Sequence, residues 1–237
     1  VIEENHSELN LFGITFHKNI NKSQEIIKGF KPEFAYVEDR STFEDLKDTS
    51  DITFLNGDSS LKELIEHDDV DVIISAISGF AGLKATYLAA STGKKILLAN
   101  KESIVAGGDL ITARAKKFNS KIIPIDSEHN AIFQCLSGQR SPNDIQNITI
   151  TASGGPFIGK KISDLKDVTK DDALNHPNWD MGRKISIDSA TLVNKCLELI
   201  EAKYLFDLEE SIFDLVIHPQ SCLLYTSDAA DDVGGVG

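Results

Sequence analysis

The sequence predicts an α/β protein whose first half is a doubly wound parallel sheet. Within residues 70–100 the apolar run VDVIISAI is followed by the turn SGFAG, the helix-compatible LKATYLAAST and a second apolar run, KILLAN, with Gly93 in the position of a helix C-cap. A strand, a helix and a strand in this order form a βαβ unit. Because the Val, Ile and Leu residues are continuous rather than alternating, we expect both faces of these strands to be buried.

The neighbouring segments extend this prediction in both directions. LFGITF (11–16) and FAYVED (34–39) are strand-like, and the helical-looking QEIIKGF lies between them. From about residue 145 the pattern changes to a strand ending in Ser-Gly-Gly and then a long helical stretch, which indicates a second domain. We therefore divide the chain into domains at 1–121 and 122–221 and a tail, 222–237, whose small, acidic and glycine residues are typical of disorder.

Composition narrows the possible partners. Thirty-seven acidic against 24 basic residues give a net charge of -13, and nucleic acids and anionic membranes are bound through clustered Lys and Arg that the sequence lacks. No apolar run approaches the roughly twenty residues of a membrane-spanning helix. The three cysteines form no CxxC pair, which argues against a disulfide framework or a zinc knuckle and favours a reducing compartment.

In a doubly wound sheet, ligands bind at the carboxyl ends of the strands. Three predicted strands end in polar segments: SAISG (75–79), ANKES (99–103) and PIDSEHN (124–130). For SAISG alone, an exposed polar turn is the better interpretation. ANKES and DSEH carry more chemistry, so we look for a functional site there.

Asp126 and Glu128 are candidate metal ligands. In an extended segment, residues i and i+2 point to the same side, and two neighbouring carboxylates are relieved of their repulsion by Mg²⁺ or Mn²⁺. An exposed acidic turn explains the pair equally well. Glu198 would be a third carboxylate, on a helix that starts near Ser189.

That helix also offers polar neighbours for the carboxylates. Asn194 and Glu198 lie on one face of it, with Lys195 beside them. The plain alternative is a solvated helix with a surface Lys195–Glu198 pair. Glu201 and Lys203 are interpreted as surface charges.

Two segments suit a phosphate group. Ser153, Gly154 and Gly155 offer backbone N–H groups after a strand, and Asp188 with Ser189 is expected to cap a helix N-terminus, whose dipole favours anions. Lys195 and Arg183 could add positive charge. An ordinary Gly-Gly turn and an ordinary N-cap are the alternatives.

The segment from His176 to Arg183 contains Trp179, the only tryptophan, followed by Met181 and Gly182. This composition is compatible with a lid over a site. A surface loop whose Trp packs inward is the commoner arrangement.

Taken together, the motifs resemble one family, the 1-deoxy-D-xylulose 5-phosphate reductoisomerases. The matching strings occur in family order and extend through most of the chain: LLANKESIV (97–105), IIPIDSEHNAIFQCL (122–136), TASGGPF (151–157), HPNWDMGRKISIDSATLVNKCLELIEAKYLF (176–206) and IHPQS (217–221). The resemblance implies a truncated Rossmann-like NADPH domain followed by an α+β metal and substrate domain.

The resemblance also implies roles for individual residues. The implied metal ligands are Asp126, Glu128 and Glu198, and the implied catalytic set adds Lys101 and His176. The implied substrate-binding set comprises Lys101, Ser127, Glu128, Ser153, His176, Ser189, Asn194, Lys195 and Glu198. The implied NADPH contacts are Lys18, Asn19, Asn100, Glu102 and Gly182, and Trp179 and Met181 match a loop that closes over substrate.

The family's reaction converts 1-deoxy-D-xylulose 5-phosphate, a phosphorylated ketose, into 2-C-methyl-D-erythritol 4-phosphate for isoprenoid biosynthesis. The implied cofactors are NADPH and a divalent metal, Mg²⁺, Mn²⁺ or Co²⁺. A homodimer is expected for the full-length enzyme, in the bacterial cytoplasm or, for a eukaryotic gene, in a plastid.

The sequence departs from the family at both ends. It starts at Val1 without the family's opening strand and glycine-rich phosphate turn, and the tail CLLYTSDAADDVGGVG does not resemble the family. We therefore expect a fragment that lacks the pyrophosphate site and a central strand, and whose own activity is weak or absent. Two rival interpretations remain: another Rossmann oxidoreductase, such as a homoserine-dehydrogenase-like enzyme, and a non-catalytic binding module.

Overall fold

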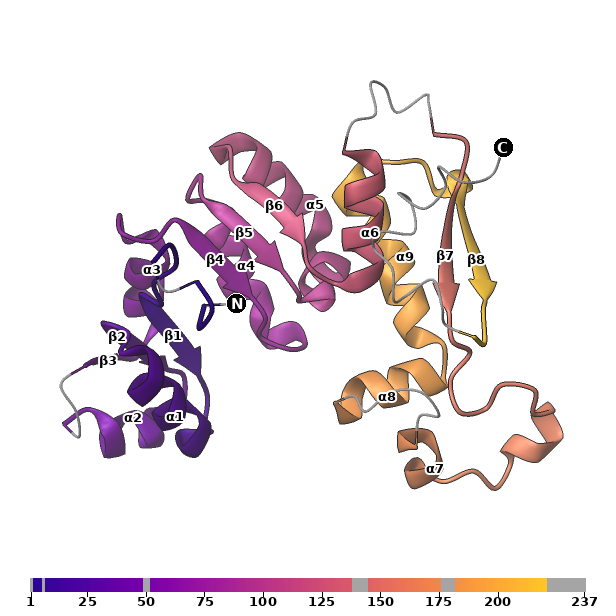
Figure 1. The fold of residues 1–237 in the computed structure, drawn as a ribbon, viewed down its shortest axis with the longest axis horizontal. Helices are drawn as coiled ribbons and strands as arrows, with labels where there is room; N and C mark the ends of the chain where they lie inside the picture. Colours follow the sequence, from indigo (N-terminus) through magenta and orange to yellow (C-terminus); the bar gives the residue numbers. More distant parts are fainter. Residues whose placement is uncertain (1, 6, 49–51, 138–144, 176–181, 221–237) are drawn as a thin grey trace.

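The computed structural model describes residues 2–5, 7–48, 52–137, 145–175 and 182–220. Figure 1 shows two halves along one long axis, the first built on β1 to β6 and the second on α6 to α9 with β7 and β8. The strands are β1 (Gly13–Phe16), β2 (Phe34–Val37), β3 (Thr53–Leu55), β4 (Val72–Ser75), β5 (Lys95–Leu98), β6 (Lys121–Pro124), β7 (Ile148–Ala152) and β8 (Phe213–Ile217). The helices are α1 (Ile20–Phe30), α2 (Arg40–Leu46), α3 (Asp58–Glu66), α4 (Leu83–Ala89), α5 (Lys101–Phe118), α6 (Ser127–Leu136), α7 (Lys170–Leu174), α8 (Arg183–Ala190) and α9 (Val193–Phe206), with short 3₁₀ turns η1 (Phe80–Gly82), η3 (Ile162–Leu165) and η4 (Glu210–Ile212).

The strands of the first half are all parallel, as the sequence predicts. They form two three-stranded sheets, β1-β2-β3 and β4-β5-β6. In the second sheet Ile96 lies opposite Ile73 on one side and Ile122 on the other. The predicted βαβ unit is therefore β4-α4-β5, and the α/β fold class is confirmed.

The core of the first half extends from β2 and α3 across one face of the second sheet. Ile96 and Leu98 of β5 are fully buried together with Ile104 and Ile111 of α5. On the opposite face of β4, Val72 and Ile74 are 41% and 56% exposed. The expectation that both faces of β4 are buried is therefore wrong. Helices α4 and α5 cover the face of the sheet that carries Ile96 and Leu98, and Val72 and Ile74 point to the other face.

Helix α4 ends earlier than its sequence suggests. It closes at Ala89 with Ala90 as the C-cap, so Gly93 does not cap the helix. Gly93 instead has φ of 77° in the turn before β5. Its left-handed conformation has the expected advantage for glycine, but the conformation serves the turn rather than the helix end.

The two halves are joined where α5 packs against α9 (Figure 1). Helix α5 departs from helical geometry at Gly107, and a Cβ on the next residue, Gly108, would lie 2.5 Å from the ring Cγ of Tyr204. Only a residue without a side chain lets the two helices approach this closely. This contact positions α9, which carries much of the candidate site.

The second half has its own small sheet and core. Strands β7 and β8 are parallel, with Ala152 opposite Ile217. Ile150 of β7 packs with Ile132 of α6 and Ala202 of α9. The domain boundary at residue 121 stays a prediction. No helix in the described part of the chain combines the length and apolar character needed to cross a membrane.

Candidate metal and substrate site

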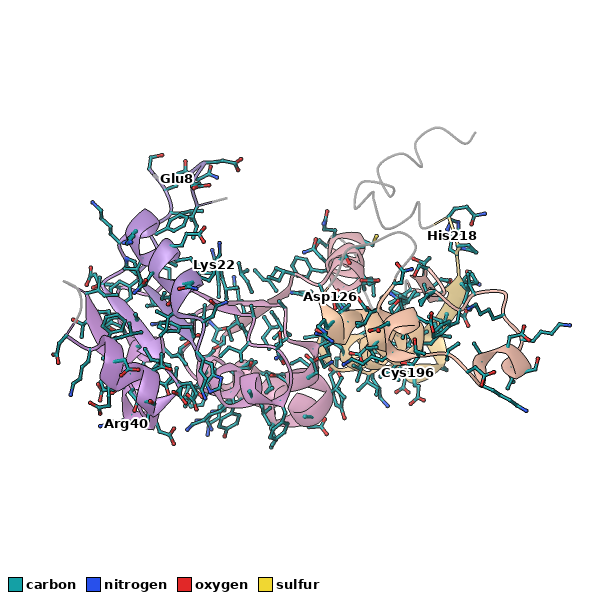
Figure 2. All side chains as sticks on the ribbon, turned by 90° about the horizontal axis from the view of Figure 1, so that it is seen from below. Glu8, Lys22, Arg40, Asp126, Cys196 and His218 are labelled. Carbon is teal, nitrogen blue, oxygen red and sulfur yellow. The ribbon has the colours of Figure 1, made fainter. Side chains whose placement is uncertain are left out.

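Three carboxylates converge where the two halves meet. Asp126 is the N-cap residue of α6, Glu128 lies in the first turn of that helix, and Glu198 comes from the middle of α9. One oxygen from each lies within 4.8 Å of the other two. Oxygen ligands at such spacing suit a hard divalent cation. Figure 2 shows Asp126 near the middle of the long axis of the molecule.

The local conformation of the first two carboxylates differs from the prediction. The sequence suggested an extended segment, but α6 begins at Ser127, because the Asp126 carbonyl accepts a hydrogen bond of 2.8 Å from the Asn130 backbone N–H. Asp126 and Glu128 meet at a helix N-terminus instead, where the helix dipole favours negative charge. Their convergence was predicted correctly for the wrong geometric reason.

Two lysines neutralise most of the charge of this cluster. The Lys101 ammonium, at the start of α5, lies 2.7 Å from Asp126 Oδ2 and 3.1 Å from Glu198 Oε1. The Lys195 ammonium lies 2.6 Å from Glu198 Oε2 and also contacts Glu128. Two positive charges then face three negative ones, which leaves room for a cation.

The interpretation of Lys195 and Glu198 as a solvated surface pair is wrong. Lys195 is 7% exposed and Glu198 is 1% exposed. Asn194 joins them, since its amide donates a hydrogen bond to Glu198 Oε1 at 2.5 Å while its oxygen accepts one from Lys101 at 2.9 Å. The residues Asn194, Lys195 and Glu198 thus form one buried polar face of α9.

The buried charges perturb one another. Burial favours neutral Lys101, but the charges of Asp126 and Glu198 outweigh it and hold the pKa of Lys101 above its ordinary value. Burial would raise the pKa of Asp126, yet the neighbouring His129, 3.7 Å away, and the Lys101 charge hold that pKa well below its usual range. Burial and the nearby Glu128 charge raise the pKa of Glu198. Asp126 is thus more firmly ionised than Glu198.

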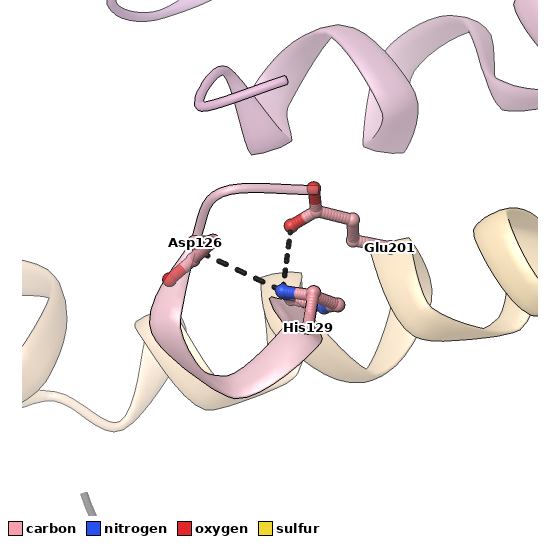
Figure 3. Close-up of side chains that lie close together, drawn as sticks. All are labelled: Asp126, His129 and Glu201. Atoms are coloured by element: carbon pink, nitrogen blue, oxygen red, sulfur yellow. Dashed lines mark ion pairs between the residues drawn. The ribbon is translucent and has the colours of Figure 1, made fainter. Parts of the chain in front are cut away.

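Two residues that the sequence did not assign lie directly behind the carboxylates. Sequence patterns indicate no role for His129 and a surface position for Glu201, but both side chains are fully buried. Figure 3 shows the His129 ring between Asp126 and Glu201. Burial raises the pKa of Glu201 to about 7, although the charge on His129 acts in the opposite direction. The spacing of Glu198 and Glu201, three residues apart on one helix face, was the available signal.

A small, partly open pocket adjoins the carboxylates at Lys195. Its lining residues come from the end of β7, the α8–α9 junction and the start of α9: Ala152, Ser153, Gly154, Ser189, Leu192, Asn194 and Lys195. The implied substrate residues Ser153, Ser189, Asn194 and Lys195 are therefore brought together. This pocket offers hydroxyl, amide and ammonium groups, which are the partners a phosphate group needs.

The helix prediction around Ser189 needs correction. Asp188 and Ser189 lie in the last turn of α8, not at a helix N-terminus. The chain reverses at Leu192, whose φ of 60° breaks the helix, and α9 begins at Val193. The helix N-terminus at this pocket therefore belongs to α9. Gly155 allows the turn after β7 to reach this junction, since a Cβ there would lie 2.8 Å from the Ser189 carbonyl oxygen.

The residues implied in NADPH binding fall into two groups. Asn100 is the buried N-cap of α5, and its amide also donates to the Gly79 carbonyl at 2.9 Å. Glu102 lies 2.6 Å from Lys184 of α8, and Gly182 is the N-cap of that helix. These three residues therefore lie around the starts of α5 and α8.

Lys18 and Asn19 form the second group, between β1 of the first sheet and α1. Lys18 pairs with Asp39 at 3.3 Å, and Asn19 caps α1 by accepting a hydrogen bond from the Lys22 backbone N–H. Figure 2 shows Lys22 in the first half, away from Asp126. Ser127 is exposed and donates to Glu128 Oε2 at 2.8 Å. His176, Trp179, Met181 and the tail at 222–237 lie outside the described residues.

Comparison with known proteins identifies the family. A family model described as 1-deoxy-D-xylulose 5-phosphate reductoisomerase matches residues 1–108, and the model of the C-terminal domain of the same enzyme matches residues 122–206. The reductoisomerase of Francisella tularensis subsp. novicida is 47% identical over 226 residues, which cover 94% of this chain and 58% of that protein. The Vesicomyosocius okutanii reductoisomerase is 44% identical over 93% of this chain and 58% of its own length.

Solved structures agree with the sequence relatives. A crystal structure of DOX-P reductoisomerase in complex with NADPH, fosmidomycin and magnesium has a TM-score of 0.86 and 41% identity, covering 93% of this chain and 57% of that one. The Zymomonas mobilis reductoisomerase in complex with NADPH has a TM-score of 0.82 and 38% identity, with 93% and 57% covered. This chain therefore spans a little under three fifths of the length of its relatives. Two models of one family, matching both halves, and relatives at 44–47% identity establish that the chain belongs to the 1-deoxy-D-xylulose 5-phosphate reductoisomerase family.

Proposed function

We propose that this chain carries the metal and substrate centre of a 1-deoxy-D-xylulose 5-phosphate reductoisomerase, an NADPH-dependent oxidoreductase of isoprenoid biosynthesis. The observation that carries the proposal is the convergence of Asp126, Glu128 and Glu198 beside a pocket lined by phosphate-binding groups. The relatives and structures named above are all reductoisomerases. They favour this family over a homoserine-dehydrogenase-like enzyme and over a non-catalytic module.

The donor set of the site fits a divalent cation. The three carboxylates offer oxygen only, and they outnumber the two lysine ammonium groups that pair with them. Magnesium appears in the name of a related structure, while Mn²⁺ and Co²⁺ accept the same ligands. Bound there, the ion supplies a Lewis acid for the oxygens of the ketose phosphate.

The chain's own groups bind and orient the substrate. Ser153, Ser189 and the N-terminus of α9 line the pocket in which we place the phosphate group, with Lys195 at its boundary with the carboxylates. Binding energy from the phosphate, far from the reacting carbons, holds the sugar in one orientation. Lys101, between Asp126 and Glu198, can offset negative charge that develops on a substrate oxygen.

We assign Asn100, Glu102 and Gly182 to the NADPH side of this centre, and Lys18 and Asn19 to the distal end of the cofactor. NADPH supplies the hydride that reduces 2-C-methyl-D-erythrose 4-phosphate to 2-C-methyl-D-erythritol 4-phosphate. Asn100 holds the loop after β4 against the start of α5, so it fixes the backbone of this face. His176, Trp179 and Met181 keep their proposed roles in binding and closure.

The proposal also covers the cellular location, the oligomeric state and the partners of the protein. The relatives named above are bacterial, which supports a cytoplasmic location. A homodimer, with no nucleic-acid or membrane partner, is proposed for the full-length enzyme. The acidic net charge of -13 disfavours binding to nucleic acids and to anionic membranes.

Calorimetric titration with 1-deoxy-D-xylulose 5-phosphate, with and without Mn²⁺, tests the centre directly. We expect the chain to bind the ketose phosphate more tightly with Mn²⁺, and we expect this gain to disappear in the double variant Asp126→Asn, Glu128→Gln. Both substitutions keep size and remove a charged oxygen ligand.

The matched control makes the same two chemical changes elsewhere, as Glu63→Gln with Asp109→Asn at exposed positions of α3 and α5. Circular dichroism establishes that each variant is folded. Binding that ignores Mn²⁺, or that survives in the Asp126, Glu128 variant, would show that the carboxylates do not form the centre.

A further inference from the structure

The space behind Asp126 holds a second polar group that the proposed chemistry does not use. His129 of α6 and Glu201 of α9 are both fully buried. The His129 Nδ1 atom lies 3.4 Å from Glu201 Oε2 and 3.7 Å from Asp126 Oδ2 (Figure 3). A buried carboxylate is costly unless it is paired, so the position of Glu201 calls for a reason.

The other ring nitrogen of His129 decides which proton the ring carries. Nε2 lies 2.9 Å from the backbone carbonyl oxygen of Glu198. A carbonyl can only accept, so Nε2 must donate and therefore bears a hydrogen. The imidazole is thereby tied to the residue whose side chain is a proposed metal ligand.

With Nε2 protonated, a neutral ring would turn the lone pair of Nδ1 toward two carboxylates. The buried atoms His129 Nδ1 and both oxygens of Glu201 have no hydrogen-bond partner among the described residues, whereas Asp126 Oδ2 is paired with the Lys101 ammonium at 2.7 Å. A buried polar atom left unpaired costs about 1–3 kcal/mol. A hydrogen on Nδ1, directed between the two carboxylates, relieves the repulsion and gives Nδ1 and the nearer Glu201 oxygen a partner.

We propose that Glu201 is a positioning residue of the metal centre, and that it acts through His129 by keeping an N–H on Nδ1 directed at Asp126. This inference rests on the proposed function of Asp126 as a metal ligand. The His129 N–H restrains one oxygen of Asp126, so the carboxylate of Asp126 keeps a fixed orientation. Substitution of a group that orients a metal ligand in this way typically weakens metal affinity 10- to 100-fold.

Glu201→Gln is the first test, because glutamine keeps the size of glutamate but offers an amide N–H to Nδ1. The ring nitrogen then accepts that bond and can no longer donate to Asp126. Titration of the full chain with Mn²⁺ should show affinity at least about tenfold weaker than in the unaltered chain. Glu210→Gln is the control, since Glu210 is exposed and pairs with Lys203 at the surface.

Two substitutions of His129 separate positioning from packing. Asparagine places its amide N–H groups near the position of Nδ1, whereas glutamine reaches toward the position of Nε2 and the Glu198 carbonyl. We expect His129→Asn to keep Mn²⁺ affinity within a few fold and His129→Gln to lose as much as Glu201→Gln. Combining Glu201→Gln with His129→Gln should cause no further loss, because both changes break one connection.

Thermal unfolding of each metal-free variant accompanies the titrations. A Glu201→Gln chain that melts like its parent but binds Mn²⁺ weakly supports the inference. If that variant does not fold, the contrast between His129→Asn and His129→Gln carries the test alone.

Three results would overturn the inference. Unchanged Mn²⁺ affinity in folded Glu201→Gln rejects Glu201 while leaving the proposed metal site in place. Two Mn²⁺ ions per chain would mean that Asp126, His129 and Glu201, whose ligand atoms also lie within 4.8 Å of one another, bind a metal themselves. No Mn²⁺ binding by the unaltered folded chain would reject both the proposed site and its support.

Discussion

At the scale of single residues, the site is built from ion pairs whose side chains are largely shielded from water. Lys195 contacts Glu128 and lies 2.6 Å from Glu198, with all three side chains largely buried. Removing one partner of such a group leaves an uncompensated buried charge, which typically costs about 3–5 kcal/mol. The lysines therefore support the fold as well as the proposed binding of substrate.

Lys195→Met should accordingly lower the free energy of unfolding by about 3 kcal/mol in metal-free buffer. A bound cation replaces the lost positive charge, so Mn²⁺ should stabilise this variant more than it stabilises the unaltered chain. Urea denaturation with and without Mn²⁺ measures both effects. Lys203→Met on the same helix is the control and should cost less than about 1 kcal/mol, because Lys203 forms an exposed pair. Equal losses in the two variants would contradict the argument.

At the scale of secondary-structure elements, the position of α9 relative to α5 depends on one close approach. Gly108 faces the ring of Tyr204, and a Cβ there would come within 2.5 Å of that ring. Glycine inside a helix is ordinarily a weakness of about 1 kcal/mol relative to alanine. At Gly108 the lack of a side chain lets α5 pack closely against α9, which connects the two halves.

Gly108→Ala should therefore destabilise the chain by about 1–3 kcal/mol, since the added methyl group forces the helices apart. Gly29→Ala in α1 is the matched control, because a Cβ there meets nothing within 4 Å. That change should instead stabilise the chain by about 0.5–1 kcal/mol. Thermal unfolding of both variants gives the sign of each effect, and a stabilised Gly108→Ala chain would contradict the close approach.

The secondary-structure elements also show which parts of the fold and the site can be predicted from sequence patterns. The βαβ unit was predictable, because hydrophobic runs and turn residues are local signals. The break between α8 and α9 was not, since Leu192 adopts φ of 60° without being glycine or asparagine. Glu201 was missed for another reason: its spacing from Glu198 places it on the same helix face, but its burial depends on α6 packing against α9, which the spacing alone does not reveal. The convergence of the three carboxylates became predictable through the family motifs.

At the scale of the whole molecule, the buried pair links stability to pH. The pKa of Glu201 is raised from 4.5 to about 7 in the folded chain, chiefly by burial, so the folded state binds its proton more tightly than the unfolded state. The resulting stabilisation is complete below about pH 4.5 and is lost as the pH rises through 7. The raised pKa of His129 acts in the same direction at higher pH.

The free energy of unfolding of the unaltered chain, relative to Glu201→Gln, should therefore fall between pH 5 and pH 8. The fall contributed by Glu201 itself has an upper limit of about 3 kcal/mol. Urea denaturation of both proteins at pH 5, 6, 7 and 8 measures it, and the comparison cancels titrating groups that lie far from Glu201. A difference that stays constant over this range would mean that Glu201 does not titrate there.

The division of the first half into two sheets affects how the chain behaves in concentrated solution. Within the described residues β1 pairs only with β2 and β4 only with β5, so each has one side whose backbone groups bond to no strand. On β4 that side runs beside the exposed Val72 and Ile74. Unpaired apolar edges of this kind are templates for strand addition from another copy. The purified chain should thus be kept dilute and cold, since crowding favours precipitates over well-dispersed molecules.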